Sequence, residues 1–404
     1  MPFAAVLGPH LLERDPPAAR AAAGQPAWVA LALALVQELL EGEDSAYAPY
    51  IDALPEHSAS PVFWDVEEDL AALQASPVVP RVVARRKQLL EAYTAAERAL
   101  EEEGASLGDE GEPLSFTLFA WAVSMVWARS FPCPTEAAGS CLVPLADALA
   151  LATEGGERGW DTDEEEDETG EAAVFVVRVG ERVSYAKGDV VFADFGQGAT
   201  ADLFLATGEV VLENPSDTLV LAAGDLAELG SQPLRGRNEE LAERAAKERR
   251  LIAEQVLGYS LSEPLVLQAD GVRPEVLKIL RVATIDDELA ANATSALEEV
   301  VAEIEENLEL SDKRHAARVL ETLRTVCRKG LAHYSTDLDT DEHSLRRAHN
   351  RPVPRPGSRA ERRLAALRMR VAEKRILQAT IEEAGRWLEG AAGYGTGTSL
   401  HDEL

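Results

Sequence analysis

The stretch Asp189 to Leu219, DVVFADFGQGATADLFLATGEVVLENPSDTL, carries the strongest information about the fold of this chain. It begins with a hydrophobic segment that ends at Phe195-Gly196 and continues as a short helical turn with Leu203 and Leu205 on its apolar face. A second hydrophobic segment, Glu209 to Leu212, follows a glycine. This order predicts a strand, a glycine-containing loop, a helix and a second strand. Because the rest of the chain is almost entirely helical in pattern, we interpret the stretch as the end of a small β-rich domain.

Length and composition are those of a globular protein with two domains. The chain has 404 residues, of which 46% are hydrophobic and 27% are charged. Its longest apolar segment, Trp28 to Leu40, is too short for a membrane-spanning helix, so we expect no membrane association. The net charge of −32 argues against non-specific binding of nucleic acid. The three cysteines lack metal-ligand spacing, so we expect a reducing compartment, no disulfide framework and no metal site.

Apolar residues at helical spacing predict several long helices. The first has Leu31, Leu35 and Leu39 on one face and is expected to be amphipathic. The predicted helices are Trp28 to Gly42, 78 to 104, Phe116 to Phe131, Arg235 to Leu257 and Ile285 to Leu308. The acidic run 154–171 predicts a solvated loop, and Ala173 to Val179 and Val183 to Tyr185 are expected to be short strands.

The opening stretch resembles the end of a SET domain of the Rubisco large-subunit lysine methyltransferase (LSMT) type. In that family a strand ending in Tyr-Gly is followed by a helix, a second Tyr-Gly and an Asn-Pro-x-Asp segment. The residues at matching positions are Gly196, Gly208, Asn214, Pro215 and Asp217. Phe195 and Thr207 stand where the family has its two tyrosines.

Two helical regions extend this resemblance from about Leu31 to Leu388. Pro49-Tyr50, Leu54-Pro55 and Trp64 are spaced as in the family's helical insert. Tyr334 to Glu342, with the long helix after it, is similar to the family's C-terminal domain, which binds the protein substrate.

The resemblance implies an α+β fold. A SET-like β-rich domain is expected at residues 1–222, with a helical insert at about 27–131 and the acidic loop at 154–171. An all-α substrate-binding-type domain is expected at 223–395, followed by a tail at 396–404. Residue 1 falls just before the helix that follows the family's N-terminal strands, so we expect those strands and their Gly-x-Gly loop to be absent.

The resemblance also implies where a methyltransferase site would lie. SET enzymes hold S-adenosylmethionine (SAM) with the Gly-x-Gly loop and an Asn-His pair, and orient the lysine amine with the tyrosine of Tyr-Gly. Ala150 and Leu151 replace Asn-His here, and neither side chain forms hydrogen bonds. The candidate residues are Phe195 at the catalytic position, Asp147, Ala150, Leu151 and Gly196 at cofactor positions, and Arg129, Thr207 and Tyr334 at substrate positions.

These replacements predict a non-catalytic member of the family. It would bind a protein partner through its C-terminal helical domain, act as a scaffold subunit within a larger assembly, and need no cofactor. The alternative is an active SAM-dependent protein-lysine N-methyltransferase, favoured by the retained Arg129, Pro144, Asp147 and Gly196. In that alternative Tyr185 takes over the role of the lost phenol.

One segment differs in charge from the rest of the chain. From Arg346 to Arg375 there are eleven Arg or Lys residues against Glu361 and Glu373. We favour a helix that packs on the acidic body and shows a solvated basic face. The alternative is a docking surface for an acidic partner or for nucleic acid.

The compartment is left open by the sequence. Family members of this kind work in plastids, cytosol or nucleus. The last four residues, His401 to Leu404, spell an endoplasmic-reticulum retrieval signal that acts only together with a signal peptide, and we interpret it as coincidence.

Overall fold

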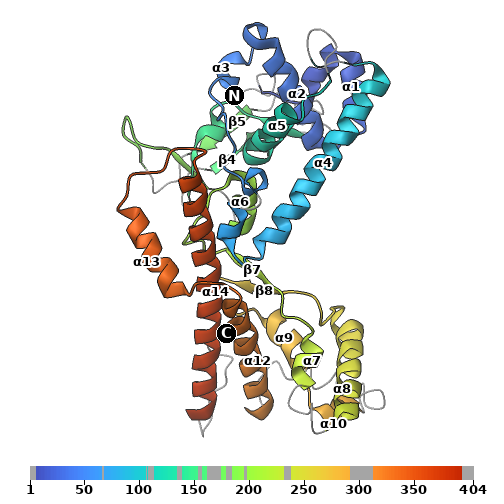
Figure 1. Ribbon diagram of the computed structural model, residues 1–404, viewed down its shortest axis with the longest axis vertical. Coiled ribbons are helices and arrows are strands. Elements are labelled where there is room, and N and C mark those ends of the chain that lie inside the picture. Colours follow the sequence, from blue (N-terminus) through green and yellow to red (C-terminus); the bar gives the residue numbers. More distant parts are fainter. Residues whose placement is uncertain are drawn as a thin grey trace. The chain divides into compact units, whose positions relative to one another are not determined.

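The computed structural model divides into two compact units (Figure 1). The first unit comprises Met1–Ala72, Val78–Glu213 and Pro352–Ala366, and the second Leu73–Pro77, Asn214–Arg351 and Leu367–Leu404. The structure describes residues 6–65, 68–105, 107, 113–133, 139–152, 157–161, 174–178, 184–194, 198–231, 238–291 and 313–393. The predicted tail at 396–404 lies outside these residues.

Helices make up most of the first unit. They are α1 (Pro16–Ala23), α2 (Ala27–Glu41), α3 (Ala48–Ile51), α4 (Val78–Glu103), α5 (Phe116–Arg129) and α6 (Thr200–Thr207). Helix α2 packs against α5 at the centre of the main hydrophobic core. All six residues from Leu31 to Val36 have no exposed surface, so the prediction of an amphipathic helix is wrong for this part of α2. A helix that is apolar on every side is covered on every side.

The strands of the first unit form three separate pairs. Strand β1 (Ser130–Pro132) pairs antiparallel with β2 (Ser140–Leu142), and β3 (Ala150–Ala152) pairs parallel with β6 (Phe192–Asp194). Strand β4 (Glu157–Asp161) pairs antiparallel with β5 (Val174–Arg178).

Strand β4 corrects part of the predicted acidic loop at 154–171, whose other residues lie outside the described part of the chain. In the register of β4 with β5, Glu157 lies opposite Arg178 and Trp160 opposite Phe175. The predicted strand at Val183 to Tyr185 is not found, because Ser184 and Tyr185 are irregular and Val183 is outside the described residues.

A small second core lies beneath β1, β2 and β5. Phe131 and Phe175 stack with ring centroids 4.8 Å apart, next to the disulfide Cys133–Cys141. The expectation of no disulfide is therefore wrong for this pair. Spacing along the chain cannot reveal that an antiparallel pair of strands brings two cysteines to a Cα separation of 5.4 Å.

Gly208 ends α6 in the left-handed conformation, with φ of +80°. A side chain at this position would overlap the carbonyl oxygen of Ala59, so the position requires glycine for two reasons. The chain then continues without regular structure, and the predicted strand from Glu209 to Leu212 is wrong.

The second unit is helical apart from one strand pair. Its elements are β7 (Thr218–Leu221), α7 (Leu226–Ser231), α8 (Glu239–Ile252), β8 (Leu265–Gln268), α9 (Pro274–Ala283), α10 (Asp287–Ala291), α12 (Lys313–Ala332), α13 (Leu338–His349) and the part of α14 (Arg359–Gly393) that follows Ala366. A π-helical turn, Ala253–Leu257, extends α8. The predicted helix from Ile285 to Leu308 is described only as far as α10.

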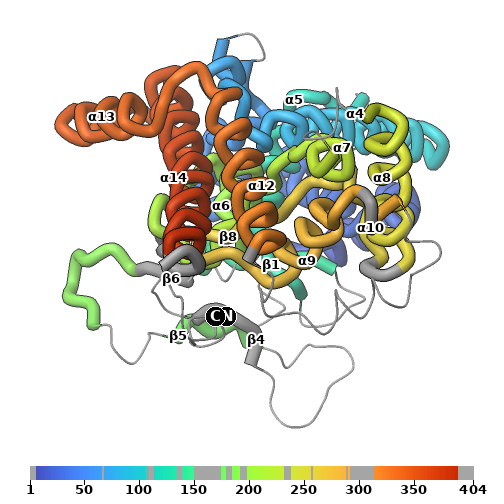
Figure 2. The backbone as a smooth tube through the Cα atoms, turned by 90° about the horizontal axis from the view of Figure 1, so that it is seen from below, coloured from blue at the N-terminus to red at the C-terminus, as the bar shows by residue number. Residues whose placement is uncertain are grey.

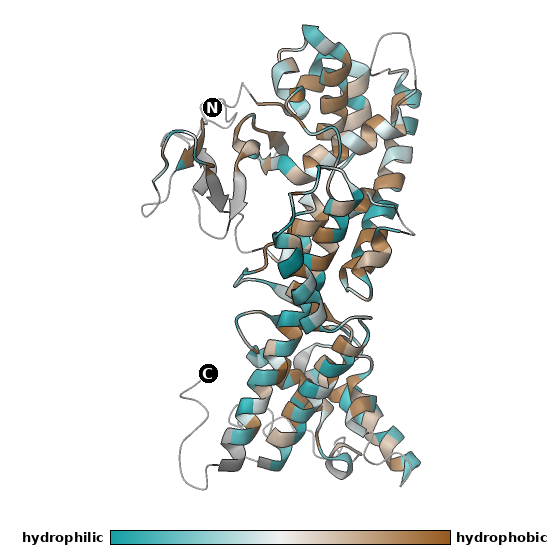
Figure 3. Cartoon of the chain, turned by 60° about the vertical axis from the view of Figure 1, so that its left-hand side comes forward, coloured by the Kyte–Doolittle hydropathy of each residue, from teal (hydrophilic) through white to brown (hydrophobic). Residues whose placement is uncertain are grey.

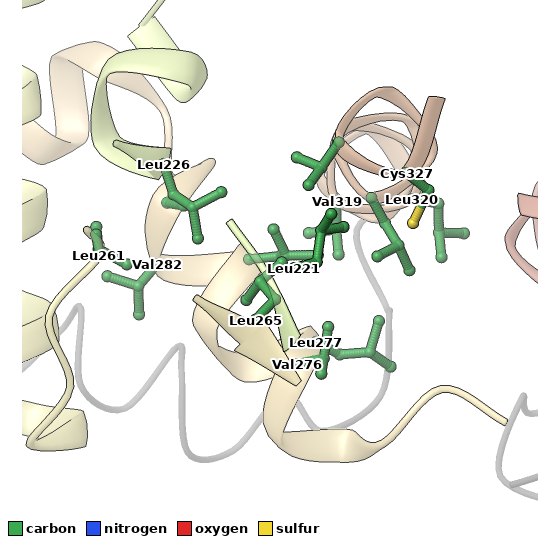
Figure 4. Close-up of a cluster of buried hydrophobic side chains, with 14 of the residues drawn as sticks. Leu221, Leu226, Leu261, Leu265, Val276, Leu277, Val282, Val319, Leu320 and Cys327 are labelled. Atoms are coloured by element: carbon green, nitrogen blue, oxygen red, sulfur yellow. The ribbon is translucent and has the colours of Figure 1, made fainter. Parts of the chain in front are cut away.

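Leucines from the strands and helices of this unit form its core (Figure 4). Strands β7 and β8 are antiparallel, with Leu219 and Leu221 of β7 buried and Val220 exposed. Figure 2 shows α12 beside α14. Each long helix carries both hydrophobic and hydrophilic residues, as Figure 3 shows. Among the described helices, none combines the length and the hydropathy that crossing a membrane requires.

Candidate functional site

A cavity of about 520 Å³ opens in the first unit. It lies among the segment around α3, the end of α5 and the turn that follows β2. The lining residues are Ala46, Tyr47, Pro49, Tyr50, Ala53, Leu54, Arg129, Pro144, Leu145, Asp147 and Ala148. Cavities of roughly 300–1,000 Å³ with mostly apolar walls and a few polar groups are typical of small-molecule sites.

The polar groups of the cavity form one network around Asp147, whose side chain is 2% exposed. Tyr50 donates a hydrogen bond from its hydroxyl to Oδ2 of Asp147 at 2.9 Å. Arg129 donates from Nη1 to the same oxygen at 3.3 Å and to the Asp147 carbonyl at 3.1 Å. The other carboxylate oxygen, Oδ1, has no hydrogen-bond partner among the residues that the structure describes.

In this arrangement the polar groups bind one another, so the network has a structural role and does not act as a general base. Burial, followed by the charge of Asp147, raises the pKa of Tyr50, so its phenol stays protonated and donates. The carboxylate of Asp147 already accepts from two donors, and the Arg129 guanidinium compensates its charge. Arg129 and Asp147 are thus brought together as the sequence predicted, but they bind each other.

Leu145 stands at the cavity with an unusual backbone. Its φ is +72°, a left-handed value that is uncommon for leucine, and its side chain is 77% exposed. The turn from Pro144 to Ala148 therefore presents a large apolar side chain to solvent beside the cavity. Strained residues of this kind are concentrated at binding sites.

The strand pair β3–β6 contains two of the predicted cofactor positions, Ala150 and Leu151. Ala150 and Leu151 are register partners of Phe192 and Ala193. The side chains of β3 and β6 are not described, and Phe195 and Gly196, which follow β6 directly, lie outside the described residues. The backbone of β3 thus pairs with the strand that ends one residue before Phe195, and neither Ala150 nor Leu151 has a hydrogen-bonding side chain.

Thr207 does not line the cavity. Its hydroxyl donates to the carbonyl of Leu203 at 2.8 Å and accepts from the amide of Glu209 at 3.0 Å. The side chain thus closes the end of α6.

Tyr334 lies in the second unit, so it is not part of the cavity. Its hydroxyl donates to Glu373 at 2.9 Å, and Ser76 donates to the other oxygen of that carboxylate at 2.6 Å. Burial is the main cause that raises the pKa of Glu373 to about 7, and the charge of Asp217 adds to the effect. Burial also raises the pKa of Tyr334.

A second set of buried polar side chains, centred on Asp341, lies beside Tyr334 and Glu373. Asp341 accepts from Lys374 at 2.6 Å and from Arg370 at 2.9 Å. Lys374 also donates to the carbonyl of Thr336 at 2.7 Å, and its ammonium lies 4.7 Å from the ring centre of Tyr334. These contacts join α13 to α14 and indicate a structural role for Tyr334. Within the described residues, no cluster of His, Cys, Asp and Glu is arranged to hold a metal.

Comparison with known proteins finds one matching family model, over part of the second unit, and solved structures with a similar fold. Residues 231–377 match the Rubisco LSMT substrate-binding family. A crystal structure of the SET domain of LSMT bound to methyllysine and AdoHcy superposes with a TM-score of 0.67 at 18% identity, over 97% of this chain and 82% of that chain. A structure of Rubisco LSMT bound to AdoMet gives a TM-score of 0.65 at 19% identity, over the same shares.

The chain has the Rubisco LSMT fold. A segment of 122 residues is 28% identical to the chloroplastic [fructose-bisphosphate aldolase]-lysine N-methyltransferase of Arabidopsis thaliana. That segment is 30% of this chain and spans about a quarter (24%) of the Arabidopsis protein. The α+β fold class and the helical C-terminal domain expected from the sequence are confirmed by these matches.

Sequence reasoning missed Tyr50 and Leu145 as cavity residues of this Rubisco LSMT fold. Tyr50 lies in a Pro-Tyr segment whose spacing resembles the family's helical insert, and that spacing gives it no role in a site. Leu145 carried no sequence signal, since nothing in a leucine predicts a left-handed backbone.

Proposed function

We propose that this chain is a catalytically inactive SET-fold protein of the lysine methyltransferase type that binds a protein partner through its helical unit. The observation that carries the proposal is the pairing of β3 with β6. It brings Ala150-Leu151 next to the strand that leads to Phe195. The Rubisco LSMT family has Asn-His and Tyr at these three positions, whereas Ala150, Leu151 and Phe195 have no hydrogen-bonding side chain.

The energetic argument starts from what methyl transfer requires. The cofactor must be held, and the neutral amine must be oriented in line with the sulfonium. Loss of one oriented donor commonly costs about 3 kcal/mol, or roughly a hundredfold or more in rate. Losing the donors at Ala150, Leu151 and Phe195 together removes both the cofactor contacts and the group that orients the amine.

SAM also fits poorly into the cavity. The cofactor carries an amino acid, a sulfonium and an adenosine, and polar parts that are buried need hydrogen-bond partners. Arg129 and Asp147 are the charged groups among the lining residues, and they are bound to each other. Among the charged side chains of the described lining, Oδ1 of Asp147 is thus the one atom left to accept a hydrogen bond from such a ligand.

The binding half of the proposal rests on the family match. Residues 231–377 match a family described as substrate-binding, and they make up most of the second unit. The relatives act on Rubisco and on fructose-bisphosphate aldolase according to their names. These two proteins are therefore the first candidate partners to test.

An active methyltransferase is the second candidate. The retained Arg129–Asp147 pair and the cavity beside it favour this candidate, because an inactive chain has no chemical reason to keep a site of this volume. Its SAM contacts would then have to come from residues other than Ala150 and Leu151.

Methyl transfer from radiolabelled SAM to purified Rubisco and aldolase tests the two candidates. We expect no incorporation with the wild-type chain, and pull-down of one of the two proteins by it. The variant Ala150→Asn/Leu151→His/Phe195→Tyr, which restores the family's residues, serves as the matched comparison. Lysine methylation by the wild-type chain would overturn the proposal.

A further inference from the structure

Two groups of basic residues can be distinguished in and beside the segment from Arg346 to Arg375, and Arg355, Arg363 and Arg368 belong to neither. The residues of the first group form ion pairs with Asp or Glu side chains. In the first unit, Arg359 and Arg362 pair with Asp69. In the second unit, Arg370 and Lys374 pair with Asp341, and Arg375 pairs with Glu342 at 2.9 Å. For these residues the simpler interpretation, a helix packed against acidic residues, is supported.

The second group lies on α13 and just after it, in the second unit. We call it the α13 basic surface, and its members are His343, Arg346, Arg347, His349 and Arg351. All five side chains are exposed. Figure 2 shows α13 on the outer side of α14.

Carboxylates hardly neutralise this surface. Arg346 reaches Glu342 at 3.5 Å, but that carboxylate makes its closer contact, 2.9 Å, with Arg375. No ion pair is found for Arg347 or Arg351 within the described part of the chain. The side chain of Arg346 remains 68% exposed.

The dipole of α13 accounts for only part of this arrangement. Cations in the last turn of a helix are favourable, and Arg346, Arg347 and His349 lie there. His343 precedes that turn and Arg351 follows it. From His343 to Ala360 the chain contains no Asp or Glu, although the whole chain has a net charge of −32. His343, Arg346 and Arg347 are spaced i, i+3 and i+4, so they share one face of α13.

We propose that the α13 basic surface is the docking site for an acidic segment of the protein partner, an inference that rests on the proposed binding role of the helical unit. The guanidinium groups of Arg346, Arg347 and Arg351 present planar pairs of donors that match carboxylates. A run of Asp or Glu side chains would supply the counter-charges that the surface lacks.

The charge of the chain favours a peptide over a nucleic acid. A nucleic acid carries one charge per roughly 1.7 Å of duplex, so phosphates beyond the α13 basic surface would meet a protein of net charge −32. A short acidic peptide carries few negative charges outside its contacts with the α13 basic surface. The chain also has no Phe, Tyr or Trp between Ser335 and Arg386, and these are the residues with the largest rings for stacking on a base.

Fluorescence anisotropy of a labelled dodecapeptide of alternating Glu and Ser, titrated with the full chain, tests the proposal. We expect binding that weakens as salt rises, and at least a tenfold loss in Arg346→Glu/Arg347→Glu. Arg328→Glu/Lys329→Glu is the matched control, because it makes the same charge change on exposed residues near the end of α12 and should lose less than twofold. Arg351→Gln provides a second, milder variant should the double reversal unfold.

Absence of peptide binding, or equal losses in the control, would overturn the docking site. Tighter binding of a DNA or RNA duplex of equal length would also overturn it. The proposed function is tested separately by SAM binding and methyl transfer. Peptide binding by a chain that also methylates lysine would remove the proposed function and leave the docking site in place.

Discussion

Replacement of Glu373 with Gln is expected to remove a pH dependence of folding stability that the wild-type chain shows. The carboxyl group of Glu373 is 2% exposed and lies among Ser76, Tyr334, Asp217 and Lys374. Its pKa is about 7 in the folded chain, against an ordinary value of 4.5. Glutamine keeps the shape and polarity of the protonated side chain but cannot ionise.

The magnitude follows from linkage between protonation and folding. Below pH 4.5 both states hold the proton of Glu373, so its contribution to stability is complete. As the pH rises from 4.5 towards 7, the unfolded chain releases the proton and the folded chain retains it, so stability falls. At about 1.4 kcal/mol per pH unit, the wild-type chain loses about 3 kcal/mol relative to Glu373→Gln by pH 8.

Urea unfolding at pH 5, 6, 7 and 8 measures this difference. Glu382→Gln is the control, since Glu382 is exposed on the same helix and should follow the wild-type curve. Parallel curves for the wild-type chain and Glu373→Gln would refute the reasoning. They would mean that Glu373 is ionised in the folded chain and that its neighbours hold the charge.

Two further predictions concern the first unit. Gly208→Ala should destabilise the unit by about 3 kcal/mol, because it combines a left-handed backbone with an overlap against the carbonyl of Ala59. Thermal unfolding measures this loss. Gly198→Ala is the control and should be neutral, because a side chain at Gly198 meets open space. Reduction of Cys133–Cys141, which encloses a short loop, should cost about 2.5 kcal/mol in the same assay, and an unchanged melting temperature after confirmed reduction would contradict this.

The helices could be predicted from the sequence because their signal is local. The predicted helices 78–104 and Phe116 to Phe131 correspond to α4 and α5, although Ser130 and Phe131 belong to β1. The strands are mostly three to five residues long and exist only in pairs. A segment as short as Glu209 to Leu212 carries the same apolar pattern as a true strand, so only tertiary pairing separates them.

For the site, the sequence predicts only which residues stand at the positions of the family's motifs. Asp147 and Arg129 were identified through the family resemblance, and the structure brings them together. Their pairing with Tyr50 depends on a separation of 97 residues in the chain, which no local pattern encodes. Tyr334 was assigned to a substrate position, but its hydroxyl is bound to Glu373 within the second unit.

Calorimetric titration of the purified chain with SAM and with AdoHcy tests the central claim most directly, because it needs no knowledge of a protein substrate. We predict no detectable heat of binding up to millimolar ligand, since Ala150 and Leu151 provide no polar contacts and Arg129 is bound to Asp147. Binding in the micromolar range would contradict the proposed loss of the cofactor site and would favour an active lysine methyltransferase.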